Sequence, residues 1–153
     1  MKRVYLFFLI IFLSLSCYSQ ITFEKGYYIN NSNQKVECLI KNVGWLNNPV
    51  EFDYKLTEVS DVEKATIKEV KEFGINSVFK YTRHTVNIDK SSSDLREISN
   101  VKTAIFNKET LFLKVLIEGK ASLYSFENDG VNRYFYKKSD TEVEQLVFKE
   151  YMT

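Results

Sequence analysis

Apolar and polar residues alternate along much of this chain with the two-residue period that is typical of a β-strand with one buried face. The clearest case is residues 51–57, where Phe52, Tyr54 and Leu56 alternate with charged or polar neighbours. β-Branched and aromatic residues are frequent throughout, and residues 20–153 contain a single proline, so the chain has strand composition. We therefore expect an all-β domain.

The first two strand-like runs, residues 25–30 and 35–42, are separated by Asn31-Ser32-Asn33-Gln34. Asparagine and serine tolerate turn geometry, so this spacing predicts a β-hairpin. Further along, residues 59–73 fit either a short strand or a single helical turn. Residues 78–88 predict a strand dense in aromatic and β-branched side chains.

Residues 89–102 contain three consecutive serines and few apolar residues, which predicts a mobile loop of about fourteen residues. Residues 111–118 are almost continuously apolar, which predicts a strand buried on both faces. Asp129-Gly130 supplies the positive φ angles of a two-residue turn. Residues 121–127 and 131–137 should therefore form a hairpin beside that strand, giving a three-stranded meander.

Residues 139–152 fit two structures. Ser139 and Glu142 have the spacing of a helix capping box, whereas residues 144–152 could add a further strand. We favour the strand, because the preceding meander needs an edge partner. The expected fold is all-β, an antiparallel meander of roughly seven to nine strands that forms a sandwich or a partly rolled sheet, with at most one or two short helices.

Residues 1–19 have the layout of a secretory signal. Lys2 and Arg3 precede a mostly apolar run, residues 4–15, that carries no charge. As a helix this run spans roughly 18 Å, which is short for a bilayer that needs about twenty residues. The layout is typical of a signal peptide rather than of a membrane anchor or a buried helix. We expect export, and a single β-rich domain over residues 20–153.

Two processing sites compete at the end of this signal. Cleavage between Ser19 and Gln20 satisfies the small-residue rule. Alternatively, Cys17 could become a lipidated N-terminus, but Ser14 and Leu15 stand where a lipobox usually has a branched apolar residue and a small one. We therefore favour cleavage before Gln20 over a lipid anchor, and we expect no transmembrane span in the mature chain.

Charge and cysteine content narrow the classes of function. Removing the signal lowers the basic residues from 21 to 19, against 20 acidic ones. This balance gives no electrostatic basis for binding nucleic acid or an anionic membrane. Cys38 is then the only cysteine, so no internal disulfide can form and packing must hold the fold. Its apolar neighbours predict a buried, unreactive thiol.

Residues that usually carry chemistry are sparse. His84 is the only histidine, so the chain has no multi-histidine metal site. A triad of His84, Asp89 and a serine from residues 91–93 is formally available. No nucleophile elbow accompanies it, and we favour His84 as an ordinary strand residue. The glycines are isolated, so the sequence has no phosphate-binding loop. We assign no catalytic residue, metal or cofactor.

Four aromatic or basic residues are candidates for an interaction surface. Trp45 lies in a turn with Gly, Asn and Pro, where it could contact a sugar or a protein, although we favour a plug over the end of the sheet. Arg133, Tyr134 and Tyr136 invite comparison with a base-stacking platform. Consecutive aromatic residues on a strand point to opposite faces and are common on β surfaces, so we do not expect nucleic-acid binding.

Four segments spread over residues 20–151 form a specific signature: Phe23–Tyr27, Lys71–Ile75, Phe112–Tyr124 and Glu144–Val147. On these segments the chain resembles a group of uncharacterised exported proteins of Bacteroidota. The resemblance implies a diderm envelope and a periplasmic, outer-membrane-associated or secreted protein, and it implies no activity. Similar chains often continue into an outer-membrane β-barrel. The resemblance therefore implies either a stand-alone form or the first domain of a longer protein.

From these observations we expect a non-enzymatic envelope module that binds a protein or peptide partner through aromatic-rich strands or an open sheet edge. Two alternatives stay open. One is a carrier of a small apolar ligand, which needs a closed sheet around a cavity. The other is a hydrolase of envelope glycans, which needs two carboxylates within about 5–10 Å of each other in a cleft.

Overall fold

Ten antiparallel strands in one sheet make up the fold. The structure is a computed structural model that describes residues 22–92, 94 and 96–152, so the expected signal, with Cys17, Ser19 and Gln20, lies outside the described residues. The strands are β1 (Thr22–Asn30), β2 (Lys35–Asn42), β3 (Glu51–Lys55), β4 (Glu63–Thr66), β5 (Val70–Ile75), β6 (Phe79–Ile88), β7 (Asn107–Ile117), β8 (Ala121–Asn128), β9 (Val131–Lys138) and β10 (Glu144–Leu146). No helix occurs in this part of the chain, and the predicted all-β class is confirmed.

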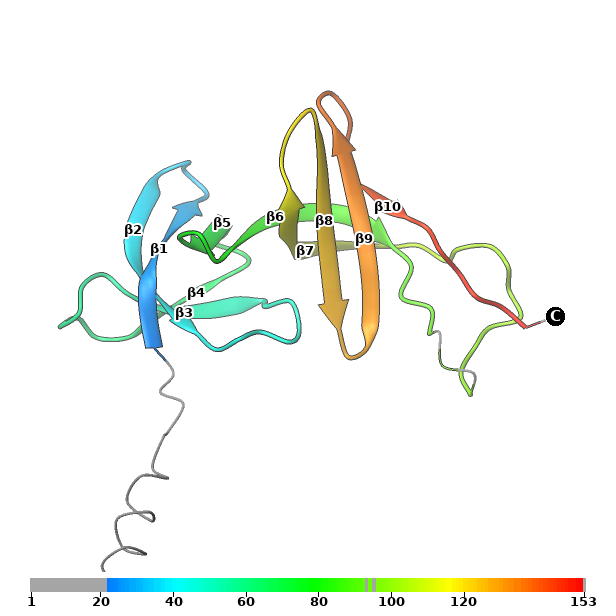
Figure 1. Cartoon of the computed structure of the whole chain (residues 1–153), viewed down its shortest axis with the longest axis horizontal. Helices are drawn as coiled ribbons and strands as arrows, with labels where there is room; N and C mark the ends of the chain where they lie inside the picture. The colour runs from blue at the N-terminus through cyan, green and yellow to red at the C-terminus, as the bar shows by residue number, and fades with distance from the viewer. Residues whose placement is uncertain (1–21, 93, 95, 153) are drawn as a thin grey trace, which may run out of the picture.

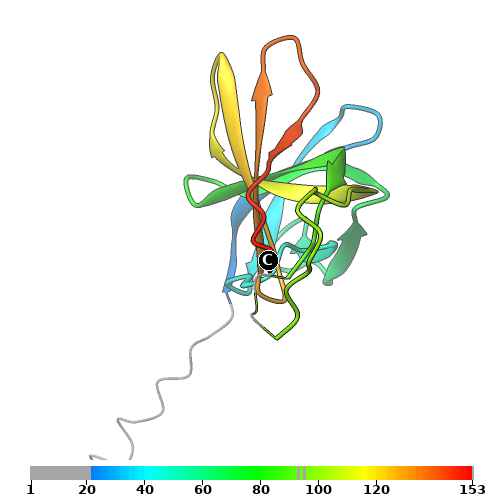
Figure 2. The same cartoon turned by 90° about the vertical axis from the view of Figure 1, so that its right-hand side faces the viewer.

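The strand order is β10-β9-β8-β7-β6-β5-β1-β2-β3-β4. Two meanders, β1–β4 and β5–β10, are therefore joined side by side through the pairing of β1 with β5. Figure 1 shows β1–β5 on the left and β7–β10 on the right, with β6 running between them. The view along the long axis shows strands that cross at steep angles, so the sheet is strongly twisted (Figure 2).

The left-hand meander must roll, because its connection is short. β4 and β5 are four positions apart in the strand order, which would separate them by about 19 Å in a flat sheet. Only three residues, 67–69, connect Thr66 to Val70, and this length of chain spans at most about 15 Å. The edge strand β4 therefore curls back towards β5, and the prediction of a partly rolled sheet is confirmed.

The paired strands β6 and β7 have one hydrophobic core on each face. Their pairing sets Arg83 opposite Phe112 and His84 opposite Leu111, so odd positions of β6 share a face with Phe112 and even positions share the other face with Leu111. The first face belongs to the N-terminal core: Cys38, Ile40, Phe52, Tyr54, Ala65, Val70, Phe73, Ile75, Tyr81 and Phe112. The second belongs to the C-terminal core: Val86, Ile88, Leu111, Leu113, Tyr124, Phe126 and Phe135.

Phe73 is the centre of the N-terminal core. It is fully buried, and its ring stacks on Phe52 at 4.1 Å and on Tyr81 at 5.3 Å between ring centroids. Phe112 meets the same ring edge-on at 5.0 Å. Cys38 lies buried in this core, and burial, followed by the charge of Glu37, raises the pKa of its thiol to about 12. The prediction of a buried thiol is confirmed.

Both predicted hairpins are present. Residue Ile29 of β1 faces Lys35 of β2 across the first turn. In the second, Asn128 faces Val131 across Asp129 and Gly130, whose φ angles are 49° and 79°. Two successive positive φ angles are the geometry that an Asp-Gly turn supplies.

Two predictions need correction at the ends of strands. Residues 111–118 were expected to be buried on both faces, but burial stops at Leu113, and Leu116 and Ile117 are exposed because the end of β7 runs beyond the core. Leu56 does not continue the alternation of residues 51–55, since β3 ends at Lys55 and Leu56 is exposed.

The segments that the sequence left ambiguous also form strands. Residues 59–73 contain β4 and the start of β5 around a turn. Residues 139–152 contain a strand, as we favoured, but only β10, with three residues, is regular. The predicted loop after β6 is irregular throughout its described residues and continues to Phe106.

Candidate functional site

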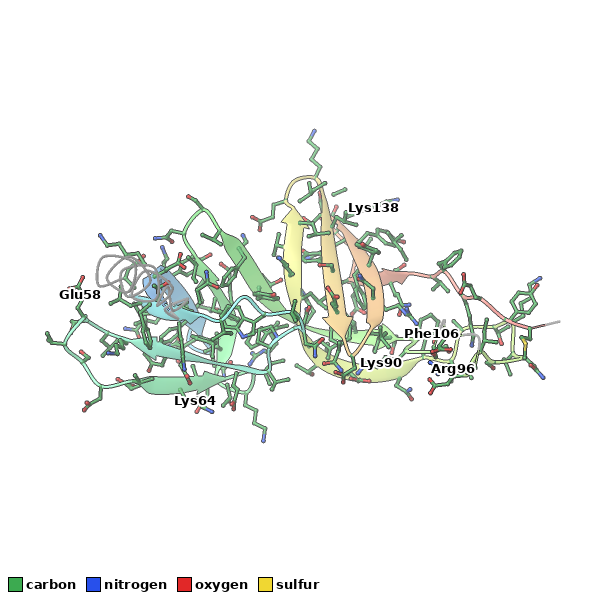
Figure 3. The ribbon with its side chains drawn as sticks, turned by 60° about the horizontal axis from the view of Figure 1, so that its bottom comes forward. Glu58, Lys64, Lys90, Arg96, Phe106 and Lys138 are labelled. Atoms are coloured by element: carbon green, nitrogen blue, oxygen red, sulfur yellow. The ribbon has the colours of Figure 1, made fainter. Side chains whose placement is uncertain are left out.

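The candidate site is a groove between β6 and β10, on the C-terminal half of the molecule. It has a volume of about 790 Å³. It is lined by His84, Thr85, Val86, Asn87, Phe106, Lys108, Lys137, Thr141, Glu142, Val143, Glu144, Gln145 and Val147. Figure 3 places Phe106 and Lys90 on this half, far from Glu58 and Lys64 on the other.

The groove follows the edges of two strands rather than the face of one. Four successive residues of β6, 84–87, line it, and so do five successive residues, 141–145, that lead into β10. Successive side chains of a strand point to opposite faces. A groove that touches all of them therefore runs along the strand edges, where main-chain N–H and C=O groups are presented.

Gln145 closes one end of this groove. Its Oε1 accepts a hydrogen bond of 2.8 Å from the N–H of Asp89, the residue that follows β6. Its Nε2 is buried and makes no hydrogen bond to the described part of the protein. A buried donor without a partner costs about 1–3 kcal/mol. Gln145 is therefore a polar residue with unused hydrogen-bonding capacity in the wall of a groove.

Asp89 anchors the loop beneath the groove. Its carboxylate accepts hydrogen bonds from the N–H groups of Ser91 and Ile105, both at 2.6 Å, and lies 3.5 Å from the ammonium of Lys149. Burial alone would raise the pKa of Asp89, but the bonds from Ser91 and Ile105, together with Lys149, hold that pKa below its usual range. The charged carboxylate fixes both ends of the irregular segment.

Arg133 binds the same loop. Its guanidinium donates to the carbonyl of Asp89 at 2.6 Å, to the carbonyl of Ser91 and to the carbonyl of Asn132 at 2.8 Å. This candidate interaction residue is thus occupied in holding the loop against β9. Three of the five N–H donors of Arg133 are therefore used within its own chain.

The other three candidate interaction residues lie in two places. Tyr134 is 46% exposed and faces Leu146 of β10, and the hydroxyl of Tyr136 donates to Glu144 at 2.9 Å. Trp45 lies in the N-terminal half, where its ring meets Phe79 edge-on at 5.1 Å between centroids, as expected of a plug over the core. The structure brings Tyr134 and Tyr136 to the β10 side and leaves Trp45 elsewhere.

His84 faces the C-terminal core from the groove. Its Nε2 lies 2.8 Å from the hydroxyl of Thr82, and its ring packs edge-on against Tyr124 at 5.1 Å between centroids. Burial, followed by the charge of Lys137, lowers the pKa of His84 to about 4. The imidazole is therefore neutral near pH 7. It is hydrogen-bonded within its own strand and makes no hydrogen bond to Asp89 among the described residues.

Charges around the groove are mixed. Lys108 and Lys137 line it together with Glu142 and Glu144, so neither sign dominates. The described residues hold no group of three or more side chains suited to a metal ion. Main-chain groups, the Gln145 amide and apolar contacts are therefore the features that this site offers.

From the sequence we assign no role to Gln145, although the pattern of apolar and polar residues around it is unusual. Residues 143, 145 and 147 share one face in a strand. Val143 packs against the C-terminal core and Val147 lines the groove, so Gln145 is a polar residue on an otherwise apolar face. A polar residue at such a position is unusual and marks a special contact.

Comparison with known proteins gives no relative: no protein-family model, curated protein or solved structure matches this chain. Among residues 22–92, 94 and 96–152, the structure holds no helix with the length and apolar character of a membrane span.

Proposed function

We propose that this chain is an exported envelope protein that acts without catalysis and binds an extended segment of a protein or peptide partner. The observation that carries the proposal is the open edge of β10. This three-residue strand ends the sheet, pairs with β9 alone among the described strands, and is followed by exposed apolar residues. An open edge beside apolar side chains suits the addition of a further strand.

β4, at the opposite edge of the sheet, is protected against pairing with another chain, in contrast to β10. β4 carries Glu63 and Lys64, and Lys64 forms an ion pair of 2.6 Å with Glu51 of β3. Ion-paired charges on an edge strand discourage pairing with another chain. By contrast, Leu146 ends β10, and Val147 and Phe148 follow it, with Phe148 76% exposed. The chain thus blocks one edge and leaves the other apolar.

The two alternative functions have weaker support. The sheet is open, with β4 and β10 at its ends, whereas an apolar-ligand carrier needs a closed barrel. The two carboxylates that line the groove, Glu142 and Glu144, are exposed, and Glu144 accepts a hydrogen bond from Tyr136. Neither lies in the buried apolar setting that suits a general acid of glycoside hydrolysis.

Selection from a random-peptide display library tests the binding proposal. Residues 20–153 serve as bait, and we expect enriched peptides in which apolar and polar residues alternate. Val147→Asp, at the rim of the groove, should reduce their binding at least tenfold. The matched Val59→Asp, at a residue that is 95% exposed in the N-terminal half, should leave binding unchanged. Failure to enrich any peptide above a selection without bait contradicts the proposal.

Export rests on the charge and apolar pattern of residues 1–19 and on the resemblance to exported proteins. Mass spectrometry of the protein recovered from the cell envelope tests it. We expect an N-terminus at Gln20. A lipidated Cys17 would replace the soluble form by an anchored one, and an intact Met1 in the cytoplasmic fraction would refute export.

A further inference from the structure

β6 is an internal strand for only part of its length. It pairs with β5 from Phe79 to Thr82, and with β7 from Tyr81 to Ile88. From Arg83 onward the described strands pair with β6 on the β7 side alone. The second half of β6 is therefore a hidden sheet edge in the middle of the strand order, and it faces the groove.

The main-chain groups that this edge presents can be assigned. The N–H of Asp89 points towards β10, because it donates to Gln145. The N–H and C=O of one residue lie on the same side of a strand, and successive residues alternate between sides. The main-chain groups of Thr85 and Asn87 therefore point into the groove, where both residues are exposed.

Gln145 acts as a substitute for the missing strand at one end. Its carboxamide carries the same acceptor and donor groups as a peptide unit. The acceptor takes the N–H of Asp89, while Nε2 is buried without a partner in the described residues. A carbonyl group entering the groove beside β6 would supply that partner once the covering side chains shift, because Nε2 is closed to solvent in the free chain.

We propose that the groove between β6 and β10 takes one extended strand of a partner polypeptide, which pairs with Thr85 and Asn87 of β6 and gives a carbonyl to Nε2 of Gln145. This inference rests on the proposed binding function and specifies its site. The strand lies along the edge of β6 that carries Thr85 and Asn87, beside residues 141–145, which line the other side of the groove. The volume of about 790 Å³ lies in the range of ligand-binding pockets.

The side-chain pattern of the occupant follows from the two faces of β6. On one face, His84 and Val86 point towards the C-terminal core, and Val143 packs against the same core. On the other face, Thr85 and Asn87 are exposed. The incoming strand should therefore alternate apolar and polar residues. The mixed charges at the rim give no preference for an acidic or a basic segment.

Amide hydrogen exchange by NMR tests the site in the chain 20–153. The probe is a synthetic peptide of about ten residues that alternates valine and threonine between terminal lysines. In the free protein, the amides of Thr85 and Asn87 should exchange at least tenfold faster than those of His84 and Val86, which face β7. Saturating peptide should slow the exchange of Thr85 and Asn87 at least tenfold and shift the side-chain amide signal of Gln145.

Two controls make the result specific. The same peptide with N-methyl groups on alternate amides keeps its side chains but cannot pair as a strand, and it should bind at least tenfold more weakly. Gln145→Leu should weaken binding at least threefold, whereas Gln34→Leu, at the exposed first hairpin turn, should not. Equal binding of the methylated peptide overturns pairing through the main chain.

The remaining outcomes separate this inference from the proposed function. Slow exchange of Thr85 and Asn87 in the free protein overturns the open edge. Binding of the probe with protection elsewhere overturns the site, while the binding function stands. If the probe fails at millimolar concentration but display-selected peptides bind, the site is again refuted and the function is retained. If neither binds, both are refuted.

Discussion

In the N-terminal half of the sheet a short covalent connection closes the roll, whereas in the C-terminal half side-chain hydrogen bonds do so. Residues 67–69 join β4 directly to β5, and Arg83 donates to the carbonyl of Ile67 and to the side chain of Asn31, both at 2.8 Å. On the other side of the β6–β7 ladder, the end of β6 is held by two side chains: the N–H of Asp89 donates to Gln145, and its carbonyl accepts from Arg133.

This difference indicates which half of the molecule has main-chain groups free to bind a partner strand. Buried main-chain groups must find partners, and a short covalent connection provides them permanently. A side chain that substitutes for a strand leaves some groups unpaired and can be displaced. In the N-terminal half the strands are therefore joined without a partner. In the C-terminal half, which shares β6 and β7 with the first, a partner strand can still add main-chain hydrogen bonds.

The largest predicted effect is a loss of stability from a substitution in the N-terminal core. Phe73→Ala should lower the free energy of unfolding by about 4 kcal/mol, because it removes a fully buried ring that packs against five other aromatic rings. Urea unfolding followed by circular dichroism measures the change. Phe135→Ala in the C-terminal core should cost about 3 kcal/mol, since the fully buried Phe135 lies in the smaller of the two cores.

The exposed Phe148→Ala serves as the control and should change stability by less than about 0.5 kcal/mol. A larger loss for Phe135→Ala than for Phe73→Ala would reverse the comparison between the two halves.

Asp89→Asn should destabilise the C-terminal half and leave the N-terminal half unchanged. The substitution removes the charge that pairs with Lys149 and places an N–H donor against either Ser91 or Ile105, so we expect a loss of about 3 kcal/mol. Hydrogen exchange should show lost protection in β10, with β1 and β2 unchanged. Equal loss of protection in both halves would contradict the comparison.

The pH dependence of the same residue has a definite sign. The pKa of Asp89 is lower in the folded chain than its ordinary value of about 3.9. Its contribution to stability is therefore present above that value and is lost as pH falls through the folded pKa. The difference in stability between the natural chain and Asp89→Asn should narrow in this acidic range.

Asn48→Ala tests the seam between the halves, with an expected loss of about 2 kcal/mol. Asn48 donates to the carbonyl of Phe112 at 2.6 Å and accepts from the N–H of Glu127 at 2.9 Å, where the pairing of β7 with β8 has ended. The neighbouring Asn47 bonds only to Asp129 at the surface. Asn47→Ala should therefore cost less than about 1 kcal/mol. Equal losses of stability for the two variants would contradict the role of Asn48 in joining the two halves.

Local signals in the sequence predict much of this fold. The alternation of Phe52 and Tyr54, the first hairpin and the Asp129-Gly130 turn are all confirmed, because neighbouring residues fix them. Residue spacing does not predict the pairing of β1 with β5, which depends on contacts between residues more than forty positions apart, such as Tyr28 and Phe73.

The site was harder to predict for the same reason. Arg133 was singled out as a surface residue, but it binds a loop more than forty residues earlier in the sequence. Gln145 was not singled out, since its meaning depends on the distant Asp89. Aromatic content pointed to Trp45 and Tyr134, whereas the groove is defined by main-chain edges, which no residue type marks.

The smallest predicted effect concerns His84 and shows how far the C-terminal half is closed. As the only histidine, it gives a single imidazole signal by NMR, and that signal should titrate near pH 4 rather than 6.5. The unfolded chain binds a proton between these values and the folded chain does not, so stability should be level above pH 7 and fall as pH drops from 6.5 towards 4. The groove peptide should lower the titration midpoint further, because it removes more water from the ring. A midpoint near 6.5 in the free chain would mean that the ring is solvated and that the C-terminal core is more open than the structure indicates.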